Sequence, residues 1–183
     1  MKLYIGDLVF PEPSGFVGKG IAAVTRSKFS HVGMVYNQEW IFEAHVWINT
    51  RLNPMSEYKG KTFRVLRPGL SKIEKHHVKK LMEEFNGNHY SVWDIATNFT
   101  FSWLKPITRR KLVNKLGSKK MMICSELVGR ILYNVDSDKY KPFEVYSGLQ
   151  PNDVFVLGLD CGMKEILEAV KEPVKKIEVI QET

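Results

Sequence analysis

The feature that most constrains the fold of this chain is a pair of strand-like segments joined by three polar residues. His31–Tyr36 and Trp40–Val46 are rich in β-branched and aromatic residues, and Asn37-Gln38-Glu39 lies between them. A three-residue connection is typical of a β-hairpin, and its length fixes which residues face each other. We therefore expect an antiparallel pair in which Gly33 lies opposite Glu43.

This register places three polar side chains on one face of the hairpin. Because side chains alternate along a strand, His31, Glu43 and His45 share a face. Glu43 is diagonal to His31, within reach of a carboxylate–imidazole hydrogen bond. A carboxylate among apolar neighbours is costly unless it is paired, whereas His31 alone also fits a polar strand end. A two-residue connection would turn Glu43 to the opposite face.

A cysteine lies at the predicted start of an amphipathic helix. Cys124 is followed at helical spacing by the apolar residues Leu127, Val128, Ile131 and Leu132. A helix N-terminus carries partial positive charge and free N–H groups, and beside an imidazolium it lowers the pKa of a thiol. The same N–H groups can hold an oxyanion. The alternative is that Cys124 is a small buried hydrophobic residue.

Further helices and strands are predicted around these two features. Ser71 and Glu74 form a capping box for a helix that ends at Gly87, and we expect this helix to bury Ile73. The other predicted elements are strands Leu3–Phe10, Thr62–Leu66 and Val154–Leu157, a short helix after Ser14 and a last helix over about Met163–Val170. Their order predicts an α+β fold in which helices pack on a mostly antiparallel sheet. We expect a single domain over residues 1–183.

Length and composition agree with a globular domain. The chain has 183 residues, of which 44% are hydrophobic and 26% charged. It has no run approaching the about 18 apolar residues of a membrane span, and Asp7 interrupts any signal-like segment. These patterns predict a cytoplasmic protein. Two cysteines provide no disulfide framework, and we expect both to be reduced.

The positive charge is concentrated in one segment. The net charge is +7, and residues 105–120 contain seven Lys and Arg and no acidic residue. This basic cluster belongs to a basic and aromatic insert at about 98–120, and a charged tail starts at about 174. The cluster is either a solvated surface or a surface that attracts an anionic partner. No motif indicates specific nucleic-acid binding.

Short motifs spread over about residues 5–157 resemble the permuted branch of the NlpC-type, papain-like cysteine peptidases, the YiiX/YebB-like proteins. In chain order they are Gly6-Asp7-Leu8-Val9-Phe10, Ser30-His31-Val32-Gly33-Met34-Val35, Phe42-Glu43-Ala44, Val65-Leu66-Arg67-Pro68, Asn88-His89-Tyr90-Ser91, Cys124-Ser125-Glu126-Leu127-Val128 and Pro151-Asn152-Asp153. Each is weak alone, and the ordered set is specific. The histidine precedes the cysteine, as in this branch and in the lecithin:retinol acyltransferase-like proteins.

The resemblance implies a papain-like fold, in which a small antiparallel barrel or sheet packs against a helix that carries the nucleophile. It implies Cys124 as nucleophile, His31 as general base and Glu43 as the residue that orients the base. Tyr90 matches a tyrosine that lines the family's active site, although it also fits a packing role. With His45 it forms our set of candidate substrate-binding residues.

These residues predict a thiol hydrolase that cleaves an amide, peptide or acyl bond through an acyl-enzyme. Expected substrates are peptides, peptidoglycan or lipid acyl groups; release by lysis or within a phage particle would reconcile a cell-wall substrate with a cytoplasmic protein. Two alternatives stay open: an acyltransferase with the same residues, and a binding module that uses the basic cluster.

A metal site is the remaining alternative. His31, Glu43, His45 and Cys124 could together hold zinc, but no CxxC or HExxH spacing supports this. We therefore expect neither a metal nor a cofactor.

Overall fold

A six-stranded antiparallel sheet forms the centre of the fold, with strand order β4-β3-β2-β1-β5-β6. The structure is a computed structural model that describes residues 2–13, 28–44, 49–88, 124–144 and 149–166. The strands are β1 (Leu8–Pro11), β2 (Gly33–Val35), β3 (Trp40–Ala44), β4 (Thr50–Pro54), β5 (Phe63–Arg67) and β6 (Lys164–Ile166). The sheet is open, with β4 and β6 at its edges, so the described strands do not close into a barrel.

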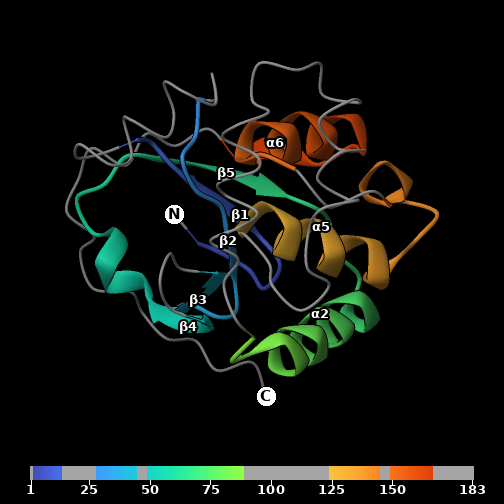
Figure 1. Ribbon diagram of the computed structural model, residues 1–183, viewed down its shortest axis with the longest axis horizontal. Coiled ribbons are helices and arrows are strands. Elements are labelled where there is room, and N and C mark those ends of the chain that lie inside the picture. Colours follow the sequence, from blue (N-terminus) through green and yellow to red (C-terminus); the bar gives the residue numbers. More distant parts are fainter. Residues whose placement is uncertain (1, 14–27, 45–48, 89–123, 145–148, 167–183) are drawn as a thin grey trace.

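Three described α-helices lie on one side of this sheet (Figure 1). They are α2 (Lys72–Phe85), α5 (Cys124–Val135) and α6 (Pro151–Asp160), and α5 contacts both of the others. Two 3-10 turns, η1 (Met55–Tyr58) and η2 (Lys141–Phe143), complete the described elements. Helices packed on an antiparallel sheet agree with the predicted α+β class. The permuted papain-like topology stays a prediction.

Both faces of the sheet are covered by apolar side chains. The larger cluster lies between the sheet and the helices; its buried members include Leu8, Phe10, Met34, Phe42, Leu66, Leu127 and Ile131. A smaller cluster covers the opposite face and contains Val9, Val35, Ile41, Val65 and, from η1, Tyr58. Successive residues of a strand point to opposite faces, which explains why neighbouring residues of β1 belong to different clusters.

The hairpin has the predicted register. Met34 lies opposite Phe42 and Val35 opposite Ile41, which leaves residues 37–39 as the connection. The Asn37 Oδ1 atom accepts hydrogen bonds from the backbone N–H groups of residues 39 and 40, at 2.9 and 2.8 Å. This side-chain bonding stabilises the turn locally. Glu43 is therefore on the face that was predicted.

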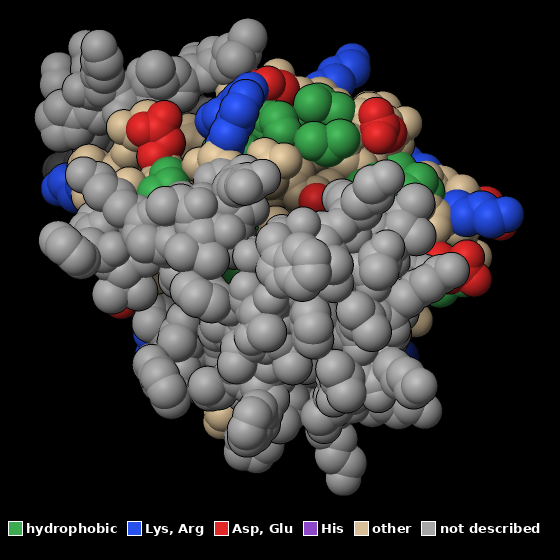
Figure 2. Space-filling model, turned by 45° about the horizontal axis from the view of Figure 1, so that its top comes forward, with side chains coloured by type: hydrophobic (Ala, Val, Ile, Leu, Met, Phe, Trp, Pro, Cys, Tyr) green, Lys and Arg blue, Asp and Glu red, His purple; other side chains and the backbone are tan. Residues whose placement is uncertain are grey.

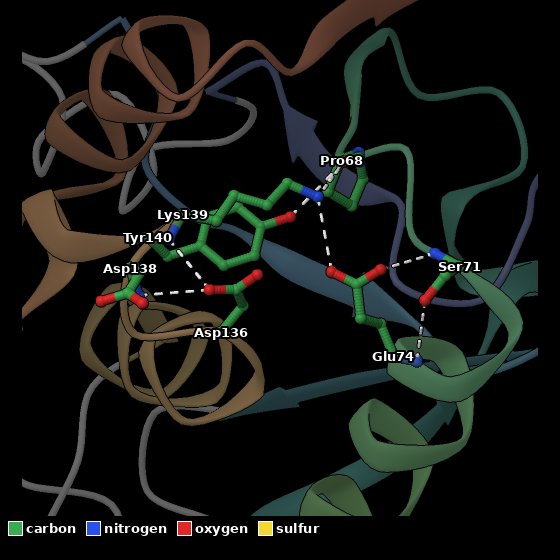
Figure 3. Close-up of polar contacts among 7 residues, drawn as sticks. All are labelled: Pro68, Ser71, Glu74, Asp136, Asp138, Lys139 and Tyr140. Atoms are coloured by element: carbon green, nitrogen blue, oxygen red, sulfur yellow. Dashed lines mark hydrogen bonds and ion pairs between the residues drawn. The ribbon is translucent and has the colours of Figure 1, made fainter.

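The end of α5 is joined to the start of α2 by a polar network (Figure 3). The predicted capping box is present, since Glu74 accepts from Ser71 N at 2.7 Å and donates its own backbone N–H to Ser71 Oγ at 3.3 Å. Lys139, beyond α5, reaches Glu74 Oε1 at 3.5 Å and Pro68 O at 3.3 Å. Tyr140 OH donates to the same carbonyl at 3.4 Å. The network holds both helices against the end of β5.

The C-terminal part of the described chain corrects two predictions. Residues 154–157, predicted as a strand, lie within the ten-residue helix α6. Pro151 in its first turn and a capping box between Gln150 and Asp153 start this helix, in which Val154 and Phe155 of the apolar run are buried. Residues 164–166, predicted as helix, form β6 and pair with β5.

Three further predictions differ from the structure. The first strand begins at Leu8 and not at Leu3, because the chain turns at Gly6, whose φ is 86°. Ile73 of α2 is 83% exposed and not part of the core. The segment after β3 had no predicted element, yet it forms β4 and η1. The predicted helix after Ser14 lies outside the described residues.

Parts of the described surface are apolar. In α6, Val156 and Leu159 are 47% and 42% exposed. On the face seen in Figure 2, hydrophobic side chains form a small group beside charged ones near the top of the molecule. Within the described ranges, none of the helices has the length and hydropathy needed to cross a bilayer.

Candidate active site

Cys124 is the first described residue of α5, and its side chain is buried with 6% exposure. The predicted apolar face of this helix is confirmed, since Leu127, Val128 and Ile131 are buried. This face packs α5 against β2 and β3. The packing therefore directs the start of the helix, with its thiol, towards the hairpin that carries His31 and Glu43.

His31 and Glu43 form a close pair. The His31 Nε2 and Glu43 Oε2 atoms are 2.7 Å apart, and the two side chains are 23% and 2% exposed. His31 precedes β2 and is not part of it, whereas Glu43 lies within β3. Gly33 lies beside this pair, since a Cβ atom there would be 3.5 Å from Glu43 Oε2. The predicted imidazole–carboxylate contact is therefore present.

His31 also interacts with Cys124. Burial lowers the pKa of His31, but the negative charge of a Cys124 thiolate, the hydrogen bond between the two side chains, and Glu43 together raise it to about 10. Because Nε2 is engaged by Glu43, the nitrogen left for Cys124 is Nδ1. The imidazole thus lies between the thiol and the carboxylate and is held in its protonated form.

Tyr58 joins the site on the face of the sheet that Glu43 shares with Val35 and Ile41, away from α5. Its hydroxyl donates to Glu43 Oε2 at 2.5 Å, and the side chain is 6% exposed. Burial, and then the charge of Glu43 and the hydrogen bond to it, raise the pKa of the Tyr58 phenol. The phenol therefore stays protonated and acts as a donor.

Sequence reasoning did not identify Tyr58, and no local motif marks it. One signal was available: a buried carboxylate has room for several donors, so a second donor besides His31 was to be expected. His45 and Tyr90, the predicted substrate-binding residues, lie outside the described residues. The same holds for the insert at 98–120, its basic cluster and the charged tail.

Comparison with solved structures finds a similar fold in a metalloprotein from a bacterium. The crystal structure of the metalloprotein YiiX (DUF1105) from Escherichia coli O157:H7 matches with a TM-score of 0.54 and 22% sequence identity. The match covers 75% of this chain and 68% of that one. No family model matches the chain, and no curated protein matches it. At this identity the structural match shows the fold alone.

Proposed function

We propose that this protein is a cysteine-dependent hydrolase in which Cys124 is the nucleophile, His31 the general base and Glu43 the residue that orients the base. One observation carries the proposal: a single imidazole contacts both a buried thiol and a buried carboxylate. A thiol, an imidazole and a carboxylate in this order form the arrangement used for nucleophilic acyl chemistry.

The reaction follows from the positions of these groups. His31 Nδ1 holds the proton of Cys124, and the thiolate attacks the carbonyl carbon of the substrate. Backbone N–H groups at the start of α5 stabilise the oxyanion that forms. When the C–N or C–O bond breaks, His31 gives its proton to the leaving group and a thioester remains on Cys124. His31 then takes a proton from water, the hydroxide attacks the thioester, and the acid and the free thiol are released.

Glu43 acts on the imidazole throughout this cycle. Its carboxylate at 2.7 Å fixes which ring nitrogen faces Cys124 and stabilises the imidazolium that forms. Since Glu43 is 2% exposed, little water screens this interaction. Its expected role is therefore orientation and charge stabilisation, without proton transfer to the carboxylate.

The class of substrate is part of the proposal. Peptides, peptidoglycan and lipid acyl groups all contain a carbonyl that the thiolate can attack, and the basic cluster at 105–120 favours anionic forms of these substrates. An acyltransferase would use the same residues and differ only in the acceptor that attacks the thioester. Product analysis with and without an amine or alcohol acceptor separates the two.

A metal-dependent reaction has less support from the side chains. The similar fold belongs to a protein described as a metalloprotein. Here Glu43 and His31 Nε2 bond to each other, which leaves His31 Nδ1 and Cys124 Sγ as donors, whereas catalytic zinc sites use three protein ligands. In the described part of the chain, no group of three or more His, Cys, Asp or Glu residues is placed to hold a metal ion. The described residues therefore do not fit a metal centre.

Alkylation of Cys124 tests the proposal, with Cys161 as a control in the same molecule. Cys124 is the more buried of the two thiols, and burial raises the pKa of Cys161. Accessibility alone would make Cys161 react faster with iodoacetamide. We expect the reverse at pH 6–7 if His31 holds Cys124 as a thiolate.

Mass spectrometry of the peptides that contain Cys124 and Cys161 gives the alkylation rate of each thiol as a function of pH. In His31→Ala, labelling of Cys124 at neutral pH should slow by at least about tenfold while labelling of Cys161 is unchanged. If Cys124 reacts no faster than Cys161 and does not respond to His31→Ala, the hydrolase proposal fails. If Cys124 instead reacts faster than Cys161 and depends on His31, the next step is a substrate screen in which the thioester on Cys124 is trapped and detected by its mass.

A further inference from the structure

The carboxylate of Glu43 is held by more than the histidine. The same oxygen, Oε2, lies 2.7 Å from His31 Nε2 and 2.5 Å from Tyr58 OH. The two donors come from segments 27 residues apart in the sequence, the start of the hairpin and η1. Charge-assisted hydrogen bonds of this length are the stronger kind, so both contacts constrain the orientation of the carboxylate.

The ring of Tyr58 is fixed independently of its hydroxyl. It is buried in the smaller cluster with Val35, Ile41 and Val65. Phe63 contacts it edge-on, with ring centroids 6.3 Å apart and planes at 85°. The turn η1 follows β4 directly, and β4 pairs with the strand that contains Glu43. The hydroxyl therefore reaches Glu43 from a rigid support, which a positioning group requires.

We propose that Tyr58 is a positioning residue that keeps Glu43 ionised and directed at His31. This inference rests on the proposed function, because it concerns the same site. The Tyr58 hydroxyl bonds to Glu43, and its proposed effect on Cys124 passes through Glu43 and His31. It is a fourth member of the site, supplied by the side of the sheet that faces away from α5.

Removing the hydroxyl has a definite physical consequence. A carboxylate that is 2% exposed is stabilised in its charged form by hydrogen bonds from neighbouring donors, because water cannot replace them. Without the Tyr58 hydroxyl, Glu43 accepts a proton at higher pH and its orientation is set by fewer contacts. The imidazolium of His31 loses part of its stabilisation, and less Cys124 is present as thiolate in mildly acidic solution.

The experiment compares two matched tyrosine variants by the Cys124 alkylation assay. Tyr58→Phe removes the hydroxyl and keeps the buried ring. Tyr36→Phe is the control, because Tyr36 OH also donates to a glutamate, Glu83, at 2.9 Å, but on an exposed surface. We expect Tyr58→Phe to lower the rate at pH 6 about tenfold and to move the acidic limb of the pH profile up by about one unit. Tyr36→Phe should leave both unchanged.

A double-mutant cycle shows whether the effect passes through Glu43. In a Glu43→Gln background there is no charge for the Tyr58 hydroxyl to stabilise, so adding Tyr58→Phe should change the alkylation rate by less than about twofold. If the two substitutions instead act additively, or if Tyr58→Phe lowers only the melting temperature and leaves the pH profile in place, Tyr58 is a packing residue and the inference is wrong.

The outcomes also separate this inference from the proposed function. If wild-type Cys124 is no more reactive than Cys161, the proposed function fails and the inference fails with it. If wild-type Cys124 is reactive and depends on His31, but Tyr58→Phe behaves like Tyr36→Phe, the inference alone is overturned.

Discussion

Replacing Gly33 with alanine tests how closely the hairpin packs around the candidate site. A Cβ atom at Gly33 would lie 2.7 Å from Ile41 Cδ1 and 2.9 Å from Ile41 Cγ1. Ordinary carbon–carbon contacts are about 3.5–4.0 Å. Rotation of the terminal methyl group cannot relieve the contact with Cγ1, so the whole Ile41 branch must move. Ile41 is fully buried, and its neighbours must move with it.

The size of the effect follows from this overlap. Forcing one extra methyl group into a packed core costs about 1–3 kcal/mol. For a domain of this length, 1 kcal/mol lowers the melting temperature by about 2–4 °C, which predicts a decrease of about 2–12 °C for Gly33→Ala. The new methyl group would also lie 3.5 Å from Glu43 Oε2, an ordinary contact distance, so it would touch both the displaced Ile41 and the carboxylate that holds His31.

Gly158→Ala is the matched control, because it also creates close contacts but with side chains other than those of the hairpin. A Cβ atom at Gly158 would lie 2.9 Å from Leu66 Cδ1 and 3.0 Å from Met163 Sδ. Replacing a helical glycine by alanine regains about 1 kcal/mol, which offsets part of the overlap. Thermal unfolding and Cys124 alkylation are measured for both variants. Gly33→Ala should lose stability and alkylation rate, whereas Gly158→Ala should keep the wild-type rate. A Gly33→Ala protein that melts within about 1 °C of wild type and labels normally would refute the packing argument.

Three further changes test other contacts. Asp7→Asn removes the charge from a carboxylate that is 1% exposed and bound by Arg67 Nη2 at 2.8 Å. Because Arg67 is 29% exposed, we expect the free energy of unfolding, measured in urea, to fall by about 3 kcal/mol, the lower end of the range for a broken buried pair. A loss below about 1 kcal/mol would contradict a buried pair. Ser71→Ala removes the cap of α2 and should cost about 1 kcal/mol by the same measurement, with Cys124 labelling unchanged as the control. For His31, the pKa of about 10 predicts that NMR finds a protonated ring at pH 8. Since folding raises this pKa from 6.5, the contribution of His31 to stability is present below pH 6.5 and is lost as the pH rises through about 10; a midpoint near 6.5 would contradict the contact with Cys124.

The parts of the site that could be predicted from the sequence are those set by local rules. The length of the connection at 37–39 fixed the hairpin register, and the register placed Glu43 beside His31. The apolar spacing after Cys124 predicted a helix that packs on the sheet through one face. Each of these inferences needed only neighbouring residues and the geometry of one element.

Contacts between distant segments were not accessible in this way. Tyr58 reaches Glu43 because β4 pairs with β3 and η1 then folds back over the sheet, and no short motif encodes that path. The four apolar residues at 154–157 have no periodicity of their own, so they fit a buried strand or a buried helix equally well. Tertiary packing and the capping box at Gln150 and Asp153 stabilise the helical conformation of this segment.

Under the proposed function, the charges around Glu43 favour a thiol over a hydroxyl as the nucleophile. Glu43 accepts from His31 and Tyr58, and Arg51 lies directly across from it in β4. These groups favour an ionised carboxylate, which favours the imidazolium, which in turn favours an anion at position 124 before any substrate binds. A thiol can supply that anion near neutral pH, whereas a serine hydroxyl cannot.

Cys124→Ser should therefore abolish turnover and not merely slow it, even though oxygen and sulfur occupy similar positions. The pKa of His31 gives the independent readout. Its rise to about 10 depends in large part on the negative charge of Cys124, so NMR should find a lower pKa for His31 in Cys124→Ser. Glu43→Gln, which keeps the thiol, should also lower the pKa of His31, because the Glu43 contribution to this pKa is distinct from that of Cys124. If Cys124→Ser leaves the His31 titration where it is, the thiolate–imidazolium pair does not exist in the free protein, and the site must instead activate its cysteine only after substrate binds.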